Sequence, residues 1–491
     1  MAGTFLLGER KVRPGAYFRR ERAGFTVEGA INGVLAIVFK SNWGPLNEVV
    51  DLDQSMLNNV DEYFGYGNGV TAIQEALIGG ATTVRCVRVG AESGDDAGSC
   101  AQVTLKTVDS TPKDAVTITA KYPGSRRFAI SVGDDLATGK RRVDVLHTTT
   151  VIESYLFDAD GNAAKDKDEA SLLVAAMKTS RFFVAELKNK GTLADTTQTD
   201  LTGGADPTVD QNAYSNGLDK LERYRWNVII SDSDSAAIRN LIVNFANTSY
   251  QTGHLGMACV ADTKNRVFDN ESNDIDATGK IQIGASFNDE KVVYIPDGWV
   301  ANDGTEFDGW RAAARIGGMI AASETNASLT HTVIKGAVRL INDRTNGEII
   351  KGEQHGCLML SRNEFDQVWI DNAINTLVTC DTDQDEGWKK IRRTKCRFEL
   401  IDRVSRTHDN LIGKLNNDDN GRATIVAAAN RIIREMSAEG KLLPESYIEI
   451  DEGHPPTGDS VWLRHYILDI DSIEKAYSTY VFRYGQSFDD T

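Results

Sequence analysis

The chain has 491 residues, of which 41% are hydrophobic and 25% charged, values that are ordinary for globular proteins. Its 54 Lys and Arg residues oppose 71 Asp and Glu residues, so the net charge is −17 at pH 7. Because nucleic-acid binding depends on cations that neutralise phosphates, this charge argues against nucleic acid as a partner of the chain as a whole. The length predicts about three domains.

Neither a membrane segment nor a metal site is indicated. The first ten residues lack the apolar run of a secretory signal, and the most apolar stretch, Val34–Phe39, is too short to span a bilayer. The six cysteines are scattered without CxxC spacing, so we interpret them as reduced, mostly buried thiols of a protein made in the cytoplasm. We expect no cofactor, no metal and no membrane partner.

The first 90 residues divide into an arm and the start of an α/β unit. Residues 1–20 are basic and contain Pro14-Gly15, which breaks any helix. We expect an extended arm there, and a frayed terminus is the alternative. Residues 21–90 are predicted to begin an α/β core. The expected elements are a strand over Gly33–Phe39, a helix from Asp53 to Phe64 that Gly65 ends, a helix over Thr71–Ile78 that Gly79-Gly80 ends, and a strand over Thr82–Val89.

The middle of the chain changes character twice. Residues 91–200 contain short strand candidates at regular spacing, which predicts an inserted β-sandwich domain with an exit helix over Asp168–Met177. Residues 201–335 alternate apolar strands with helices, which predicts an α/β domain with a mainly parallel, helix-covered sheet. Its expected strands are Trp226–Ser231, Leu255–Val260 and Val292–Ile295.

The last part is predicted to be a separate α+β domain, residues 336–475, followed by a C-terminal arm, residues 476–491. Strands are expected over Trp369–Val378 and Val461–Ile470, and two long helices over Gly387–Leu415 and Arg422–Glu439. The predicted fold is therefore multidomain α+β, with extended arms at both ends.

Three carboxylates provide a candidate catalytic or metal site. Asp232, Asp262 and Asp297 each follow a predicted strand, and ligands of open parallel sheets bind at the carboxyl ends of strands. Such a set can hold a metal or act as acid and base. The alternative is that they cap helices or start turns, which suits Asp232 because a helix follows it directly.

A second candidate is a basic stretch at the start of the first long C-terminal helix. Lys389, Arg393 and Arg397 share one helical face, while Ile391, Phe398 and Ile401 face the core. This set is predicted to seat an acidic partner, and a solvated surface is the alternative. Its members are Lys389, Lys390, Arg392, Arg393 and Arg397, with Lys395 between them.

The C-terminal arm alternates aromatic and β-branched residues over Tyr477–Tyr484. A strand of this kind is costly if it stays unpaired, so it pairs either within the chain or with the sheet edge of another copy. Two strand-prone arms on one chain favour reciprocal strand exchange, which builds open polymers. The residues expected to make these contacts are Val12, Pro14, Gly15, Tyr17, Phe18, Tyr480, Phe482 and Tyr484.

A series of short motifs runs through essentially the whole chain. In chain order they are Arg13–Phe18, Gly33–Phe39, Trp43-Gly44-Pro45 with Asn47, Phe64-Gly65, Gly79-Gly80-Ala81, Val84, Arg88-Val89, Tyr122–Ser125, Asn375-Thr376-Leu377, and Trp388 with Ile391. No single motif is specific, but in this order they make the sequence resemble the contractile tail sheath proteins of myophage-type phages, prophages and phage-tail-like particles.

The resemblance implies a structural subunit that polymerises helically around a tail tube and contracts to drive the tube through a host envelope. Its implied partners are copies of itself, the tail tube protein, and baseplate and tail terminator proteins, and its implied place of assembly is the bacterial cytoplasm. The family's α/β domain is similar to subtilisin, but no Ser-His-Asp set is recognisable here, so no peptidase activity is expected. The implied position of the basic helix is against an acidic tube. The alternative function is an α/β hydrolase-like enzyme that uses Asp232, Asp262 and Asp297.

Overall fold

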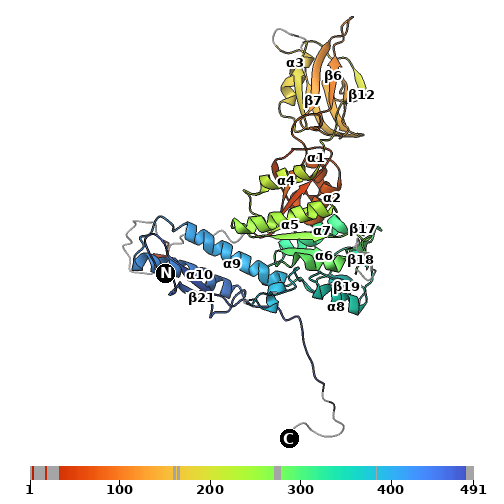
Figure 1. The fold of residues 1–491 in the computed structure, drawn as a ribbon. Helices are drawn as coiled ribbons and strands as arrows, with labels where there is room; N and C mark the ends of the chain where they lie inside the picture. Colours follow the sequence, from red (N-terminus) through yellow and green to blue (C-terminus); the bar gives the residue numbers. More distant parts are fainter. Residues whose placement is uncertain are drawn as a thin grey trace, which may run out of the picture.

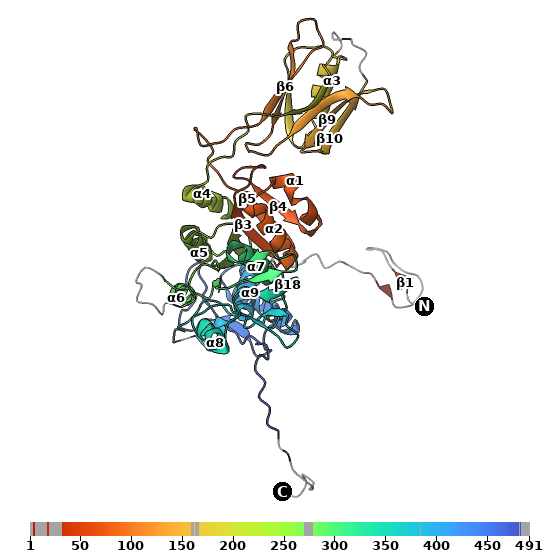
Figure 2. The same cartoon turned by 90° about the vertical axis from the view of Figure 1, so that its right-hand side faces the viewer.

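The computed structural model describes residues 32–158, 162, 166–269, 278–382, 384–480 and 482, together with the backbone of residues 3–4 and 17–18. A β-rich part lies at one end of the molecule and a central α/β part lies next to it (Figure 1). A helical hairpin extends to one side, and the C-terminal segment leaves the body at the end opposite the β-rich part (Figures 1 and 2). None of the helices within these described ranges has the length and apolar stretch needed to cross a bilayer.

The central sheet has six strands in the order β15-β14-β13-β3-β5-β4. All neighbours pair in parallel except β4, which is antiparallel to β5, so the predicted, mainly parallel sheet is confirmed. The strand β4 is the next element after the buried strand β3 and was not expected from the sequence. The strand bounds are β3 Val34–Phe39, β4 Val49–Asp53, β5 Thr83–Arg88, β13 Val228–Ser231, β14 Met257–Ala261 and β15 Val292–Ile295.

Both faces of this sheet are buried, because helices cover each of them. Successive side chains of a strand point to opposite faces and so enter two different cores. In β3, Leu35 and Ile37 join the core beneath α2 and α7, while Ala36 and Val38 join the core beneath α4 and α5. The covering helices are α2 Asn68–Gly79, α4 Gln211–Leu221, α5 Ala236–Gln251, α6 Lys280–Phe287 and α7 Gly309–Ala322. A 3₁₀ helix, Gln54–Asn59, and α1, Val60–Phe64, occupy the stretch where one helix was predicted.

The helices α2 and α7 approach each other closely because both contribute glycine to the contact. A Cβ atom at Gly318 would lie 2.2 Å from the Ala76 carbonyl oxygen, and one at Gly79 would lie 2.4 Å from the Arg315 carbonyl oxygen. Any side chain at either position therefore forces the two backbones apart. The Arg315 guanidinium also pairs with the buried Glu75 carboxylate of α2, at 3.1 Å between Nε and Oε2.

The β-rich part contains two antiparallel sheets around one apolar core that α3 helps to close. One sheet has the order β10-β9-β8-β12 and the other β11-β7-β6. The elements are β6 Gln102–Lys106, β7 Asp114–Ala120, β8 Ala129–Asp134, β9 Arg141–His147, β10 Thr150–Phe157, α3 Glu169–Met177, β11 Phe183–Leu187 and β12 Thr196–Asp200.

Two buried arginines join the β-rich part to the central part. Arg88, at the end of β5, donates from Nη1 to the carbonyl oxygens of Gly44 at 2.8 Å and Pro123 at 2.9 Å. Arg126 donates from Nη1 to the Asp61 carbonyl oxygen at 2.8 Å and stacks against Trp43, 5.3 Å from the ring centroid. The connection therefore has a packed, hydrogen-bonded core of its own.

The remainder contains small sheets and the helical hairpin. The helices α9 and α10 share an apolar core with β21, to which Leu400, Ile433 and Ile448 contribute. The elements are β16 Trp299–Ala301, β17 Glu306–Phe307, β18 Ala337–Leu340, α8 Asn346–Gln354, β19 Leu360–Arg362, β20 Val368–Ile370, η3 Glu386–Lys389, α9 Ile391–Asp409, α10 Asp419–Ala438, β21 Tyr447–Ile450 and β22 Leu463–Tyr466.

The predicted helix Gly387–Leu415 is wrong at both ends. The chain forms the 3₁₀ turn η3 and then has an extended residue, Lys390, before α9 begins at Ile391. The Asp385 side chain caps η3, and a β-bridge between Lys390 and Ile374 holds Lys390 extended. Sequence periodicity does not detect this bridge, because it joins residues 16 positions apart.

Three other expectations need correction. The strand predicted over Trp369–Val378 is short and ends at Ile370, and the one predicted over Val461–Ile470 is reduced to Leu463–Tyr466. The described part of Tyr477–Tyr484, residues 477–480 and 482, forms no strand. At the other end, the backbones of β1, Gly3–Thr4, and β2, Tyr17–Phe18, pair in parallel. Val12, Pro14, Gly15 and Tyr484 lie outside the described residues.

Candidate functional site: the anchor of the C-terminal segment

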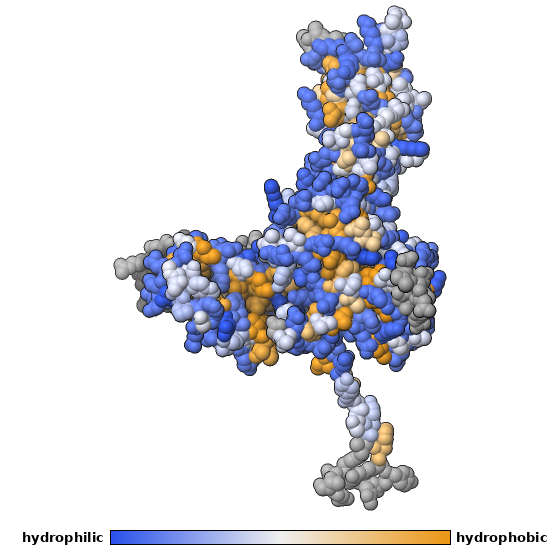
Figure 3. All heavy atoms as spheres, viewed as in Figure 1, coloured by the Kyte–Doolittle hydropathy of each residue, from blue (hydrophilic) through white to orange (hydrophobic). Residues whose placement is uncertain are grey.

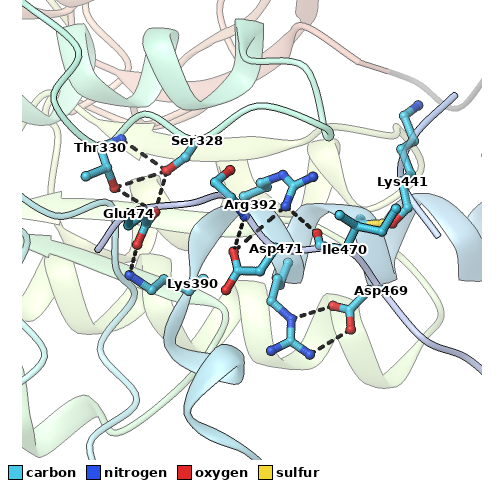
Figure 4. A network of polar contacts seen from close by, with 12 residues as sticks. Ser328, Thr330, Lys390, Arg392, Lys441, Asp469, Ile470, Asp471 and Glu474 are labelled. Carbon is cyan, nitrogen blue, oxygen red and sulfur yellow. Dashed lines mark hydrogen bonds and ion pairs between the residues drawn. The ribbon is translucent and has the colours of Figure 1, made fainter. Parts of the chain in front are cut away.

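The basic start of α9 binds the chain's own C-terminal segment, which we define as residues 467–482. The segment leaves β22 and runs along the beginning of α9, where acidic side chains meet the cations (Figure 4). We call these contacts the anchor. Its residues are Lys390, Arg392, Arg393 and Arg397 on the helix side, and Asp469, Ile470, Asp471 and Glu474 on the segment.

The best-defined contact in the anchor is between Arg393 and Asp469. The guanidinium donates from Nε to Oδ2 at 2.7 Å and from Nη2 to Oδ1 at 2.6 Å, which is the bidentate geometry of a strong ion pair. Burial opposes ionisation of Asp469, but the hydrogen bonds from Arg393 outweigh burial and hold the pKa of this carboxyl below its usual range. Both side chains are largely buried, at 14% and 11% exposure, so water screens the pair weakly.

Backbone contacts fix the same stretch of the segment. The Leu443 amide donates to the Leu468 carbonyl oxygen at 2.8 Å, and the Ile470 amide donates to the Lys441 carbonyl oxygen at 3.0 Å. The Arg392 guanidinium donates to the Ile470 carbonyl oxygen and lies 3.8 Å from Asp471. Backbone hydrogen bonds and one isolated β-bridge, Leu442 with Asp469, therefore hold the segment through Ile470.

The last tethered residue is Glu474. Its Oε2 accepts a hydrogen bond from Lys390 Nζ, and its Oε1 accepts from Ser328 Oγ at 2.8 Å and Thr330 Oγ1 at 2.9 Å. Burial acts to raise the pKa of Glu474, but the hydrogen bonds from Lys390 and Ser328 outweigh it and lower the pKa. Lys390, which precedes α9, and Ser328 and Thr330, which follow α7, thus fix the Glu474 carboxylate at the point where the segment leaves the body.

Beyond Glu474 the segment projects into solvent (Figure 3). Tyr477 is 91% exposed, Tyr480 77% and Phe482 90%. A soluble monomer rarely keeps a row of aromatic side chains in water on an unpaired extended chain. The exposed row is the feature expected of a segment that pairs with another molecule.

These contacts change the interpretation of the basic stretch. Lys389 pairs with Glu386 at 2.8 Å, and Arg397 pairs with Glu290 at 2.5 Å while stacking on Trp388, 4.0 Å from its ring centroid. Lys389, Lys390, Arg392, Arg393 and Arg397 thus each have an acidic partner within the chain. Lys395 is buried, and its Nζ donates to the carbonyl oxygens of Ile320 and Ser323. Neither a free basic face nor a solvated one therefore describes this stretch. The predicted contact with an acidic tube stays a prediction.

Sequence reasoning did not identify the acidic side of the anchor. Its signal is the stretch Asp469–Glu474, in which three carboxylates follow a strand in a chain that has a dense basic stretch elsewhere. The paired charges are 76 residues apart for Arg393 and Asp469 and 84 residues apart for Lys390 and Glu474, so they meet only because the hairpin α9–α10 returns the chain to the start of α9. Of the core-facing residues expected on α9, Ile391 and Phe398 are buried, whereas Ile401 is 44% exposed.

The three aspartates lie at the carboxyl ends of β13, β14 and β15, as predicted, and all three are buried. They do not combine into one site. Asp232 accepts hydrogen bonds from the Tyr214 hydroxyl at 2.6 Å and the Lys40 amide at 3.0 Å. It does not cap α5, whose N-cap is Ser235, so the capping alternative is also wrong for this residue.

The other two aspartates each have their own cations. Asp262 pairs with Arg239 at 2.8 Å and Arg266 at 2.9 Å. Asp297 pairs with Lys280 at 2.9 Å and Arg344 at 2.8 Å. Within the described ranges, no three His, Cys, Asp or Glu side chains are grouped so that they could hold a metal ion. The structure therefore separates the predicted acidic set into one hydrogen-bonded carboxyl group, Asp232, and two ion-pair clusters around Asp262 and Asp297.

Comparison with known proteins agrees with this architecture. Residues 208–376 match the family model of the phage tail sheath protein central domain. The uncharacterized protein YqbK of Bacillus subtilis (strain 168) is 22% identical over 405 residues, which cover 79% of this chain and 78% of that protein.

Two solved structures share the fold. A sheath tail protein from Desulfitobacterium hafniense superposes with a TM-score of 0.70 at 19% identity, over 93% of this chain and 97% of that one. The helical sheath of the anti-feeding prophage, in its contracted state, gives a TM-score of 0.53 at 8% identity, over 96% and 99% of the two chains. The match of residues 208–376 and the two superpositions thus make this chain similar in its central domain and in its overall fold to phage tail sheath proteins.

Proposed function

We propose that this protein is the subunit of a contractile tail sheath, in which copies polymerise helically around a tail tube and contract to drive the tube through a host envelope. The match of residues 208–376 to the phage tail sheath protein central domain supports the proposal. The observation that carries it is the C-terminal segment, which is anchored as far as Glu474 and then presents Tyr477, Tyr480 and Phe482 to solvent.

A sheath must keep its subunits connected while their relative angles change. An extended segment that adds a strand to a neighbour's sheet supplies that connection, because backbone hydrogen bonds hold the strand while the chain before it acts as a tether. The anchor sets where the tether begins, since Glu474 is fixed by Lys390, Ser328 and Thr330. We infer that subunits are linked by exchange of residues 476–491, with residues 1–20 as a second proposed arm.

The proposed partners are further copies of this chain, a tail tube protein, and baseplate and tail terminator proteins. We propose assembly in the cytoplasm of a bacterial host, as part of a phage tail or a tail-like particle. Because the cations from Lys389 to Arg397 are engaged within the chain, we propose that any tube contact they make is shared with the carboxylates of Asp469 and Glu290.

Negative-stain electron microscopy of the concentrated full chain tests the proposal. We expect tubes or stacked rings from the natural chain, and none from a chain that ends at Lys475. A Tyr480→Asp, Phe482→Asp double variant should also stay unassembled, because charged side chains cannot enter an apolar seat on a neighbour. The matched control is Phe365→Asp, which alters an 82% exposed aromatic residue on the β19–β20 turn and should leave assembly intact.

Three results would contradict the proposal. One is unchanged assembly of the chain that ends at Lys475. Another is a stable monomer from the natural chain at every concentration and salt condition. The third is equal loss of assembly in Phe365→Asp and in the tail variants, since that would attribute the defect to general surface change.

A further inference from the structure

The anchor continues from Glu474 into the body through a line of hydrogen bonds. Lys390 Nζ, which binds Glu474, also donates to Asn372 Oδ1 at 2.9 Å. The Asn372 amide nitrogen Nδ2 then donates to Glu353 Oε2, on α8, at 3.3 Å. Lys390 is therefore shared between the C-terminal segment and a polar cluster that includes Asn372 and Glu353 of α8.

This cluster contains two carboxyl groups next to each other. Glu353 Oε1 is buried and receives no hydrogen bond from any group in the part of the chain that the structure describes. The neighbouring carboxyl is Asp371, which accepts a hydrogen bond from Ser361 Oγ. A negative charge on one carboxyl group makes ionisation of a close neighbour costly, and this favours the protonated form of Glu353.

The charges around Glu353 come from each of the elements packed against it. Asp371 follows β20, Lys390 precedes α9, and Glu474 lies beyond Lys390 on the C-terminal segment. On α8 itself, Lys351 pairs with Asp269. Burial raises the pKa of Glu353 to about 7 against the hydrogen bond from Asn372, and Asp371 adds to the rise while Lys390 opposes it.

We propose that Glu353 and Asp371 form a proton-dependent latch on the C-terminal segment. With Glu353 protonated, the cluster carries one negative charge fewer and leaves Lys390 to Glu474. When Glu353 ionises, the added negative charge competes with Glu474 for Lys390 and repels Glu474, so the segment is released as far back as Asp471. The latch deepens the proposed function, because it regulates the segment that we propose links subunits.

The direction of the pH effect follows from linkage. When Glu474 is docked, its negative charge offsets part of the attraction between Lys390 and ionised Glu353, so Glu353 holds its proton more strongly than in the undocked state. Docking is therefore favoured at pH values below the docked pKa of Glu353 and weakens as the pH rises through about 7. The lowered pKa of Glu474 acts at the other end, since its contribution is lost as the pH falls below its ordinary value of 4.5.

Hydrogen–deuterium exchange of the full chain, read by mass spectrometry on peptides covering residues 467–475, tests the latch. Comparing the natural chain with Glu353→Gln at one pH cancels the intrinsic pH dependence of exchange. We expect equal rates at pH 6 and roughly three- to tenfold faster exchange of the natural chain at pH 8, where only it carries the extra charge. The control Glu364→Gln, at an exposed turn, should match the natural chain at both pH values.

Two further variants keep the test decisive. Asp371→Asn removes the other half of the pair and should reproduce the Glu353→Gln result, also if Glu353→Gln fails to fold. Glu474→Gln removes the charge that competes for Lys390. With this substitution, chains with and without Glu353→Gln should exchange residues 467–475 at the same relative rate at pH 6 and pH 8. A natural-to-variant ratio that is the same at pH 6 and pH 8 would overturn the latch.

The latch and the sheath proposal fail separately. The exchange experiment uses the unassembled chain, whereas sheath formation is read by electron microscopy. A pH-dependent ratio in a chain that never assembles supports the latch and contradicts the proposed function. Assembly together with a natural-to-variant exchange ratio that is the same at pH 6 and pH 8 supports the proposed function and contradicts the latch.

Discussion

Arg393 and Asp469 are 76 residues apart and form a bidentate ion pair, with N–O distances of 2.7 and 2.6 Å, that ties the C-terminal segment to the start of α9. Backbone hydrogen bonds hold Leu468 and Ile470 on either side of Asp469, and Glu474 is tethered further along the chain. The pair therefore strengthens the attachment of the segment before its last tethered residue.

Removing one partner of this pair should loosen the segment. In Arg393→Ala, Asp469 stays largely buried and loses two charge-assisted hydrogen bonds. We therefore expect the free energy needed to detach the segment locally from the body to fall by about 1.5–3 kcal/mol. Exchange of the residue 467–471 amides measures this. The control Arg431→Ala removes a 3.5 Å pair with Glu435 whose partners are 49% and 43% exposed, and should cost little. Unchanged exchange in Arg393→Ala would refute the role of the pair.

The connection between the β-rich and central parts should depend on Arg88. Arg88→Met removes the donors that satisfy buried carbonyl oxygens of Gly44 and Pro123, which should lower the free energy of unfolding by about 2–4 kcal/mol. Chemical denaturation followed by tryptophan fluorescence measures the loss. Arg127→Met, at a neighbouring exposed position, is the control and should be nearly neutral. Equal stability of the two variants would show that the parts are held by apolar packing alone.

The contact between α2 and α7 should not tolerate a methyl group. Gly318→Ala places Cβ 2.2 Å from the backbone oxygen of Ala76, so we expect a loss of about 1–3 kcal/mol and a lower melting temperature. Gly347→Ala provides a matched control in α8, because a Cβ there meets open space. It should stabilise the protein by roughly 0.5–1 kcal/mol through helix propensity. Calorimetry that ranks the two variants in the opposite order would contradict the packing argument.

The sheet-edge aspartates should respond oppositely to pH. Burial raises the pKa of Asp232 from 3.8 to about 6, so the folded state binds its proton more tightly and this group's stabilisation is lost as pH rises from about 4 to 6. Burial also opposes ionisation of Asp297, but hydrogen bonds from Arg344 and Lys280 outweigh it and lower the pKa, so its stabilisation is lost as pH falls below 3.8.

Asn variants of each residue test this difference by denaturation at several pH values. In Asp232→Asn, the decline of stability between pH 4 and 6 should become smaller. In Asp297→Asn, stability should fall at neutral pH by about 3 kcal/mol, because Lys280 is fully buried and left without its charge partner. Parallel stability curves for the natural chain and Asp232→Asn would contradict the assignment.

Local patterns in the sequence determined the main elements. Apolar runs such as Val34–Phe39 and Val292–Ile295 form strands that are buried on both faces, and glycines such as Gly65 and Gly80 end helices with positive φ. The same patterns placed the three aspartates at strand ends. These features depend on residues close together in the chain, which is why periodicity and capping rules detect them.

Only the tertiary structure decided what the charged residues do. The sequence presents the cations from Lys389 to Arg397 as a free basic face and the aspartates as one acidic set. The fold instead pairs Arg393 with Asp469, Lys390 with Glu474, and each aspartate with its own partners. The physical reason is that burying a charge is stable only with a partner close by, and that partner comes from whichever distant segment the packing of the core brings there.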